Sequence, residues 1–177
     1  MRLLLIRHGL SSFNIERRIQ GRIDLSLLTD KGKEQAFKTG EALTGLSIDA
    51  LYTSPLKRAS NTADEILLGS GNKSIQPVLD KGLLEVDLGP WSGLTTKEVK
   101  INFPNEYALW KKDPEELLLK KEDGTIYSPI KETRNQVTNF LEKIINLHSS
   151  KEDSTILIVA HNAILRCLLL ELLGNPK

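Results

Sequence analysis

The 177-residue sequence has a single cysteine and no long apolar run. One cysteine, Cys167, excludes an intramolecular disulfide and a cysteine-rich zinc site, and it fits a reducing compartment. The apolar stretch at residues 167–170 stops at Glu171, far short of the roughly 20 residues that cross a bilayer. The N-terminal apolar run at residues 3–6 meets Arg7 and is too short for a secretory signal. We therefore expect a cytoplasmic protein without a membrane span.

Neither sign of charge is in excess. Lysine and arginine together number 24 and aspartate and glutamate 23, which gives a net charge of +1 at pH 7. Without a strong positive field, nucleic acid and anionic membranes are poor partners, and we expect neither. The length suits one domain, because a chain of this size buries roughly 70% of its unfolded surface. No internal repeat, linker or composition shift divides residues 1–177, which we interpret as a single domain.

Aliphatic runs alternate with helical patterns along the chain, and this alternation is typical of α/β folds. Residues 3–6 and 155–160 have the continuous apolar character of fully buried strands. Shorter strands are expected at residues 48–52 and 75–79, the second at a sheet edge because it contains Pro77. We predict a three-layer sandwich, with a mostly parallel central sheet and helices on both faces. The expected helices are residues 29–46, 54–67, 95–103, 137–148 and 163–173.

Two of the three histidines come directly after the buried strands. In open α/β sheets, ligands bind beyond the carboxyl ends of the strands, so His8 and His161 would share one crevice if their strands are neighbours. A third strand leads to Ser54, the predicted cap of the next helix. Arg58 then lies in the first turn, where backbone N–H groups favour an anion. Arg7 and Arg58 can each bind phosphate oxygens bidentately.

Several short motifs occur in order between Arg2 and Gly174. Residues 7–14 (RHGLSSFN) match the pattern Arg-His-Gly-x-Thr-x-x-Asn, with Ser11 in place of the threonine. These motifs resemble the histidine phosphatase superfamily, the group that includes the cofactor-dependent phosphoglycerate mutases. One tripeptide would be weak evidence, whereas ordered motifs along nearly the whole chain are strong. The remaining motifs are residues 20–21 (QG), 28–36 (LTDKGKEQA), 54–63 (SPLKRASNTA), 85–93 (EVDLGPWSG) and 160–166 (AHNAILR).

The resemblance implies a phosphoglycerate mutase-like fold and phosphoryl transfer through a histidine. It assigns His8 as the nucleophile, and Glu85 as the general acid for the leaving oxygen and then the base for water. Arg7, Arg58 and His161 would hold the phosphoryl oxygens. It implies neither a metal nor a cofactor, and the flanking arginines would repel a metal cation. The further substrate contacts that it implies are Ser11, Asn14, Gln20, Gly21 and Asn162.

The sequence also departs from the family pattern. Leu10 replaces a frequent glutamate, and Asn162 followed by Ala163 replaces a glycine-rich stretch after the second histidine. The chain stops shortly after its last helix, whereas family members usually continue with at least one more strand. One or more C-terminal strands of the family fold are therefore expected to be missing, and a naturally short protein and a fragment are both open. Substrate choice is expected at the pocket rim, in residues 10–22 and 100–130.

Three functions are open from the sequence. The leading one is a phosphomonoesterase that hydrolyses a small phosphorylated metabolite through a phosphohistidine at His8. The second is a mutase that returns the phosphoryl group to another hydroxyl. Family mutases usually carry paired arginines in an inserted segment, whereas residues 94–130 here contain lysines but no arginine. The third, a non-catalytic phosphate-binding module, is disfavoured because a binder needs no general acid such as Glu85. A homodimer is compatible with all three.

Other residues have open or ordinary interpretations. Trp91 and Trp110 either wall a substrate cleft or pack in the core. His148 and Cys167 lie on apolar helix faces, where packing explains them better than catalysis. The segment at residues 98–114 also resembles photosynthetic-lineage members of the family, which include sugar-phosphate phosphatases.

Overall fold

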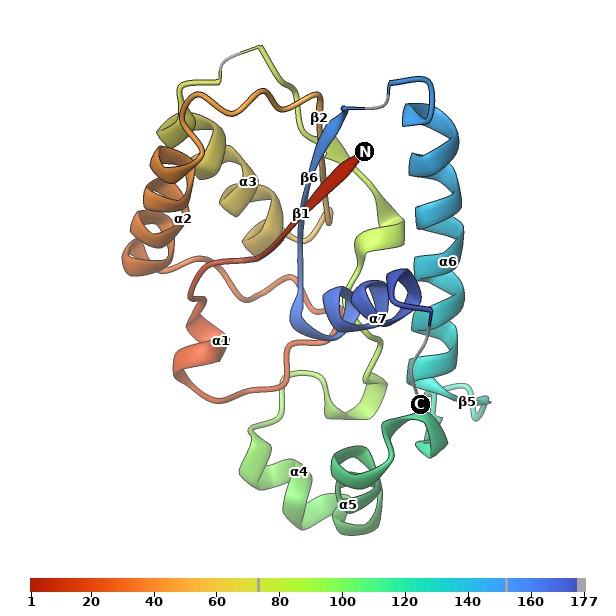
Figure 1. Ribbon diagram of the computed structural model, residues 1–177. Coiled ribbons are helices and arrows are strands. Elements are labelled where there is room, and N and C mark those ends of the chain that lie inside the picture. Colours follow the sequence, from red (N-terminus) through yellow and green to blue (C-terminus); the bar gives the residue numbers. More distant parts are fainter. Residues whose placement is uncertain (73, 152, 175–177) are drawn as a thin grey trace.

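The computed structural model describes residues 1–72, 74–151 and 153–174 (Figure 1). In this part of the chain, one sheet has the strand order β1-β6-β2-β3, and every neighbouring pair is parallel. The parallel sheet confirms the predicted architecture, and β3, which follows Pro77, lies at an edge as expected. The strands are β1 (Arg2–Arg7), β2 (Ala50–Thr53), β3 (Val78–Leu79) and β6 (Thr155–Ala160).

Helices cover both faces of the sheet, so the predicted three-layer sandwich is confirmed (Figure 1). α2 (Asp30–Ala42) and α3 (Lys57–Ser70) pack on one face, and α6 (Pro129–His148) and α7 (Asn162–Leu172) pack on the other. Successive residues of β6 point into opposite cores, which explains its unbroken apolar sequence. The buried residues of the first core are Ala36, Ile48, Leu51, Ala63, Ile66, Leu157 and Val159. On the second face, β6 contributes Ile156, Ile158 and Ala160.

The start of one helix was predicted correctly and the start of another was not. The Thr29 hydroxyl caps α2 by accepting a hydrogen bond from a backbone N–H of its first turn (3.0 Å). The predicted cap at Ser54 is wrong, because the N-cap of α3 is Leu56. The Ser54 hydroxyl accepts a hydrogen bond from the Leu56 N–H (3.3 Å), just before α3 begins, and it also lies 2.8 Å from Nε2 of His161. Arg58 still lies in the first turn of α3.

A segment of short elements connects β3 to α6 and lies at the lower end of the molecule in Figure 1. Trp91 is fully buried within it, with ring centroids 6.3 Å from Phe103 and Tyr107 and 6.2 Å from Trp110. Of the two roles open for Trp91, the structure therefore shows core packing. The elements are α4 (Thr96–Asn102), α5 (Pro104–Lys112), the antiparallel pair β4 (Leu119–Lys120) and β5 (Ile126–Tyr127), and the 3-10 turns Lys81–Leu83, Gly89–Trp91 and Pro114–Glu116.

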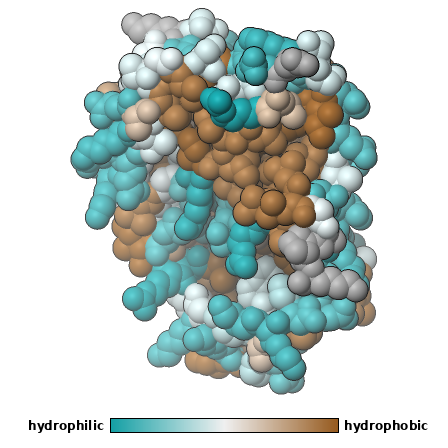
Figure 2. Space-filling view, viewed as in Figure 1, coloured by the Kyte–Doolittle hydropathy of each residue, from teal (hydrophilic) through white to brown (hydrophobic). Residues whose placement is uncertain are grey.

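The face of the molecule that carries β1 and α7 is broadly apolar (Figure 2). β1 is an edge strand of the described sheet, and α7 exposes Leu169, Leu170 and Leu172. The expectation that strands are missing after the last helix concerns the chain beyond Gly174, outside the described residues. None of the helices in the described part of the chain is both long and apolar enough to cross a membrane.

Candidate active site

The parallel register of β1 and β6 brings the two predicted histidines together. Arg7 pairs with Ala160, so the next residue on each strand leaves the sheet at the same edge. These residues are His8 and His161, and their ring centroids lie 5.2 Å apart with a tilt of 60° between the planes. The His8 N–H also donates to the Ala160 carbonyl (2.9 Å), which extends the ladder by one bond.

His8 is a neutral base with one free ring nitrogen. Its Nδ1 lies 2.8 Å from the Gly9 carbonyl, and a carbonyl only accepts, so Nδ1 carries the hydrogen and Nε2 keeps its lone pair. Burial lowers the pKa of His8 to about 4, helped by the charges of Arg58 and Arg7 and opposed by the Gly9 hydrogen bond. The imidazole is therefore uncharged at neutral pH, as a nucleophile must be.

Arg58 is a fully buried cation with spare donors. Its Nε donates to Nδ1 of His161 (3.2 Å). Its two terminal nitrogens donate to the carbonyls of Ile23 and Gly21, each at 2.8 Å. A guanidinium carries five N–H donors, so two remain for a ligand. Within the described residues Arg58 has no carboxylate at ion-pair distance, and an unpaired buried cation is costly. An anion in this site would remove that cost.

His161 lies beside His8 with both ring nitrogens engaged. Because Nδ1 accepts from Arg58, the hydrogen resides on Nε2, which donates to the Ser54 hydroxyl (2.8 Å). Burial first, and then the charge of Arg58, lower the pKa of His161 well below its ordinary value. These contacts orient the guanidinium of Arg58. A direct contact of His161 with phosphoryl oxygens stays a prediction.

Glu85 lies at the N-terminus of α7. Its carboxylate accepts hydrogen bonds from the N–H groups of Val86 (2.9 Å), Ile164 (3.1 Å) and Ala163 (3.3 Å). Loss of hydration raises the pKa of Glu85 above its ordinary value, against these hydrogen bonds and the charge of Arg58. A carboxyl group with a raised pKa can carry the proton that a leaving oxygen needs.

A cavity of about 240 Å³ lies among these groups. Three of the residues implicated by the sequence do not line it. One is His161, and the other two are Ser11 and Asn14 of the loop and single turn α1 (Ser12–Ile15). The buried Ser11 hydroxyl lies 2.9 Å from Asn14 Oδ1 and 3.1 Å from Gln20 Oε1, so this pair supports the loop that presents Gln20. The implicated residues that do line the cavity are Arg7, His8, Gln20, Gly21, Arg58, Glu85 and Asn162.

Comparison with known families matches this arrangement. The sequence profile of the histidine phosphatase superfamily (branch 1) matches residues 3–177. The chain belongs to this superfamily. The match extends over the strands, the histidine pair and the loop of Glu85, so it agrees with the resemblance carried by the motifs.

Two similar proteins have phosphatase names. The chain is 38% identical over 173 residues to a probable 2-carboxy-D-arabinitol-1-phosphatase of Arabidopsis thaliana, which covers 98% of this chain and 33% of that protein. It is 30% identical over 174 residues to phosphoserine phosphatase 1 of Hydrogenobacter thermophilus, covering 98% of this chain and 77% of that one. The chain therefore spans about a third of the plant relative.

A solved structure confirms the fold of the superfamily in this chain. YhfR of Bacillus stearothermophilus superposes with a TM-score of 0.85 at 30% sequence identity, and the match covers 98% of this chain and 80% of that one. The α/β sandwich with its parallel sheet is thus shared with this solved structure over nearly all of the present chain.

Several cavity residues of this superfamily member were not singled out from the sequence. Arg18 lies in the predicted rim at residues 10–22, but only the structure shows that its side chain lines the cavity. Its guanidinium donates to the Gly93 carbonyl (2.9 Å) and pairs with Glu16 (2.6 Å), which fixes it at the cavity wall. Trp110, for which the sequence left a cleft wall and core packing open, lines the cavity and also contacts Trp91. The remaining unassigned lining residues are Ile19, Val86, Leu88 and Ala163.

The main chain at Glu85 is held by hydrogen bonds from Arg22 and Gln136, which the sequence did not indicate. Arg22 donates from Nε to the Glu85 carbonyl (3.0 Å) and from a terminal nitrogen to Gln136 (2.9 Å). Gln136 in turn donates to the carbonyls of Gly82 and Leu84, so α6 holds the main chain on which Glu85 sits. No pattern in the sequence links residues so far apart. In the part of the chain that the structure describes, no group of three or more His, Cys, Asp or Glu side chains is arranged to hold a metal ion.

Proposed function

We propose that this protein is a phosphomonoesterase that hydrolyses a small phosphorylated metabolite through a phosphohistidine at His8. The observation that carries the proposal is that one cavity holds neutral His8 beside the buried cation of Arg58. Arg58 keeps two N–H groups for an anion, and Arg7 adds a second guanidinium at the cavity. Guanidinium groups match phosphate oxygens bidentately, so a phosphoryl group fits beside the nitrogen nucleophile.

In the first step, Nε2 of His8 attacks phosphorus. The N–P bond forms while the bond between phosphorus and the leaving oxygen breaks, and Glu85 gives its proton to that oxygen. In the second step, water attacks phosphorus, the N–P bond breaks, and Glu85 takes up the proton of the water. Arg7 and Arg58 stabilise the charge on the phosphoryl oxygens in both steps. Alcohol and phosphate are released, and His8 and Glu85 return to their starting protonation states.

The relatives support hydrolysis, since the plant and the Hydrogenobacter proteins are both named as phosphatases. Because the chain spans about a third of the plant relative, the activity, substrate and partners of the whole protein are all part of this proposal. The net charge of +1 supports the absence of a nucleic-acid partner. The single cysteine, which is buried, supports a reducing, cytoplasmic setting. A homodimer stays a prediction that light scattering on the purified protein would decide.

The first experiment is a two-product assay. The protein is incubated with 3-phosphoglycerate in EDTA, free phosphate and 2-phosphoglycerate are measured together, and p-nitrophenyl phosphate serves as an activated ester. We expect phosphate release without added metal and no 2-phosphoglycerate. Isomerisation without phosphate release would make the protein a mutase. If neither ester gives any product, the phosphate-binding module would be favoured.

Replacing His8 tests the nucleophile directly. His8→Ala should lower turnover by more than about 10³-fold while the far-ultraviolet circular dichroism stays unchanged. The fold should survive because the imidazole lies beyond the end of β1 rather than in either core. Retention of more than about a tenth of the wild-type rate in a clean preparation would remove His8 from this role.

A further inference from the structure

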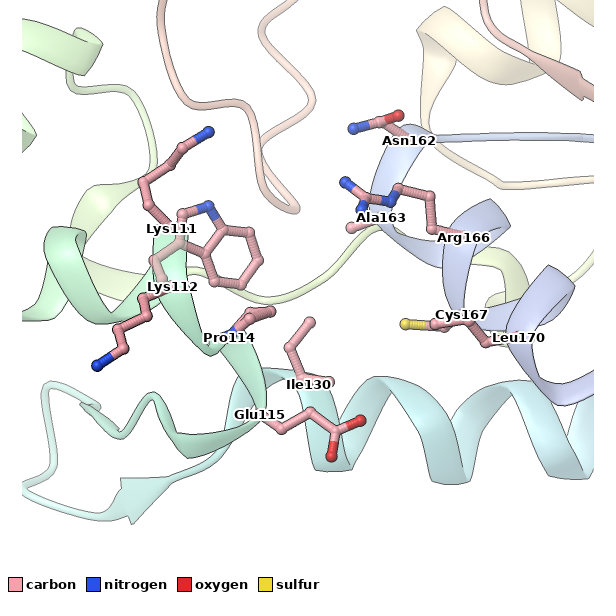
Figure 3. A pocket seen from close by; sticks show the side chains of 11 residues that line it. Lys111, Lys112, Pro114, Glu115, Ile130, Asn162, Ala163, Arg166, Cys167 and Leu170 are labelled. Carbon is pink, nitrogen blue, oxygen red and sulfur yellow. The ribbon is translucent and has the colours of Figure 1, made fainter. Parts of the chain in front are cut away.

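A second, larger cavity adjoins the candidate active site (Figure 3). Its volume is about 530 Å³, and it lies between α5 with the turn that follows it on one side and α7 on the other. Trp110, Asn162 and Ala163 line both cavities and thus form the boundary between them. His8, Arg58 and Glu85 do not line it, so it is separate from the phosphoryl chemistry while opening beside it.

The walls of this second cavity carry positive charge. Arg166 extends from α7 toward the opposite wall, which carries Lys111 (Figure 3). Across the described ranges, neither Arg166 nor Lys111 makes an ion pair. The acidic residue of the lining, Glu115, is paired with Arg134 at 2.6 Å, so its charge is compensated. Lys112 also lines the cavity and makes no ion pair among the described residues, but its amine points away from α7 in Figure 3, so Arg166 and Lys111 are the cations on facing walls.

The rest of the lining suits a carbon chain. Pro114, Ile130, Cys167 and Leu170 make an apolar floor. Burial raises the pKa of Cys167 to about 11, so its thiol adds no charge at neutral pH. At the boundary, the Asn162 amide points into the gap between the walls in Figure 3 and can donate to or accept from a hydroxyl group.

We propose that this cavity, the Arg166 subsite, binds a carboxylate on the leaving group of the substrate. The inference rests on the proposed function, because the phosphoryl end of the ester is placed at His8. The carbon chain then passes Trp110 and Asn162, and its far end meets Arg166, whose planar guanidinium matches a carboxylate bidentately. The substrate class is a phosphorylated polyhydroxy acid. Arg166 determines specificity and takes no part in the chemical steps.

The test compares two esters that differ in one group. In 6-phosphogluconate the carbon opposite the phosphate end is a carboxylate, and in sorbitol 6-phosphate it is a hydroxymethyl group. Calorimetric titration of His8→Ala, in which hydrolysis is blocked, measures both dissociation constants. We expect 6-phosphogluconate to bind at least about tenfold more tightly, which one charge-assisted bidentate contact supplies.

Substitutions in the His8→Ala protein then test whether Arg166 causes the tighter binding of 6-phosphogluconate. Adding Arg166→Gln should reduce the ratio of the two dissociation constants to about twofold or less, since the charge is lost and the length is kept. Arg2→Gln is the matched control, because Arg2 is exposed at the opposite end of β1 and lines neither cavity, and the ratio should not change. Thermal unfolding of each variant checks that the fold is intact.

The outcomes separate this inference from the proposed function. Equal binding of the two esters, no binding of either, or a preference that survives Arg166→Gln would overturn the Arg166 subsite. Turnover answers a different question. If the unsubstituted protein hydrolyses neither ester nor p-nitrophenyl phosphate, the phosphatase proposal fails, while the calorimetric ratio still decides whether the subsite binds a carboxylate.

Discussion

Nε of Arg58 donates to Nδ1 of His161 across 3.2 Å, and both side chains are fully buried. Because arginine cannot accept a hydrogen bond, this contact fixes the tautomer of the imidazole as well as the plane of the guanidinium. Ser54 accepts from the other ring nitrogen, and the carbonyls of Gly21 and Ile23 hold the far end of Arg58. Protein partners thus hold the Arg58 guanidinium in place, which is the arrangement that electrostatic catalysis at the proposed anion site requires.

Arg58→Lys should lower kcat/KM for phosphomonoesters by about 100-fold or more, although the charge is kept. A lysine has three donors on one nitrogen and cannot serve His161, the two carbonyls and a phosphoryl group together. Steady-state kinetics measure the loss. Arg2→Lys is a suitable control, because Arg2 is exposed at the opposite end of β1 and should be silent. A loss smaller than about fivefold would show that the cation matters only as a charge.

Glu85→Gln should lower kcat for alkyl phosphates far more than for p-nitrophenyl phosphate. A nitrophenolate departs without a proton, whereas an alkoxide needs the one that Glu85 carries. The ratio of the two kcat values is the measurement. Asp87→Asn, two residues along the same loop, should leave that ratio unchanged. Equal losses on both esters after Glu85→Gln would argue against protonation of the leaving group by this residue.

The free energy of unfolding should fall as the pH drops from 6.5 to 4. His8 has a pKa of about 4 in the fold against 6.5 for a free imidazole, so within this window the unfolded chain binds a proton that the folded protein excludes. The loss attributable to His8 is at most about 3 kcal/mol and is complete near pH 4. His161, whose pKa is also lowered, acts in the same direction.

Urea unfolding of the wild type and of His8→Asn, at pH 7 and again at pH 4.5, isolates this contribution. The variant lacks the titrating imidazole and should lose less stability between the two pH values than the wild type does. Parallel losses in the two proteins would mean that His8 binds its proton as readily in the fold as in the unfolded chain.

Gly9→Ala should destabilise the fold and disturb the nucleophile together. A Cβ at Gly9 would overlap the backbone carbonyl of Gly32 in α2, and neither main chain can move aside cheaply. We expect a cost of about 1–3 kcal/mol, together with a loss of turnover because the Gly9 carbonyl holds Nδ1 of His8. Thermal unfolding and kinetics below the transition measure the two effects.

Gly45→Ala provides the comparison for that experiment. Gly45 is exposed, has a φ of +82°, and no atom lies within 4 Å of its added Cβ. The substitution should cost about 1–2 kcal/mol through backbone conformation alone and leave turnover intact. If Gly9→Ala unfolds like Gly45→Ala and keeps full turnover, the close approach of the loop to α2 has no role in holding His8.

Some site residues could be located from the sequence because local pattern and position suffice. His8 and His161 each follow an apolar run, and parallel strands end at one edge of a sheet. Other features could not, because distant residues decide them. The sequence placed the start of α3 at Ser54, and it could not show that the Ser54 hydroxyl contacts a histidine more than a hundred residues away. Trp91 and Trp110 look alike in the sequence, and only the packing of α5 separates core from cavity wall.

Sequence alone predicted the parallel α/β sandwich, the superfamily and a histidine after each of two buried strands, because strand and motif patterns reside in neighbouring residues. That these two strands are neighbours was decided by the tertiary structure. The tertiary structure decided which nitrogen of His8 is free, how many donors Arg58 keeps, and that a cationic cavity opens beside the candidate active site. The physical reason is that proton affinity and hydrogen-bond capacity depend on burial and on partners from remote segments, such as Gly21 for Arg58. Only folding brings those partners together.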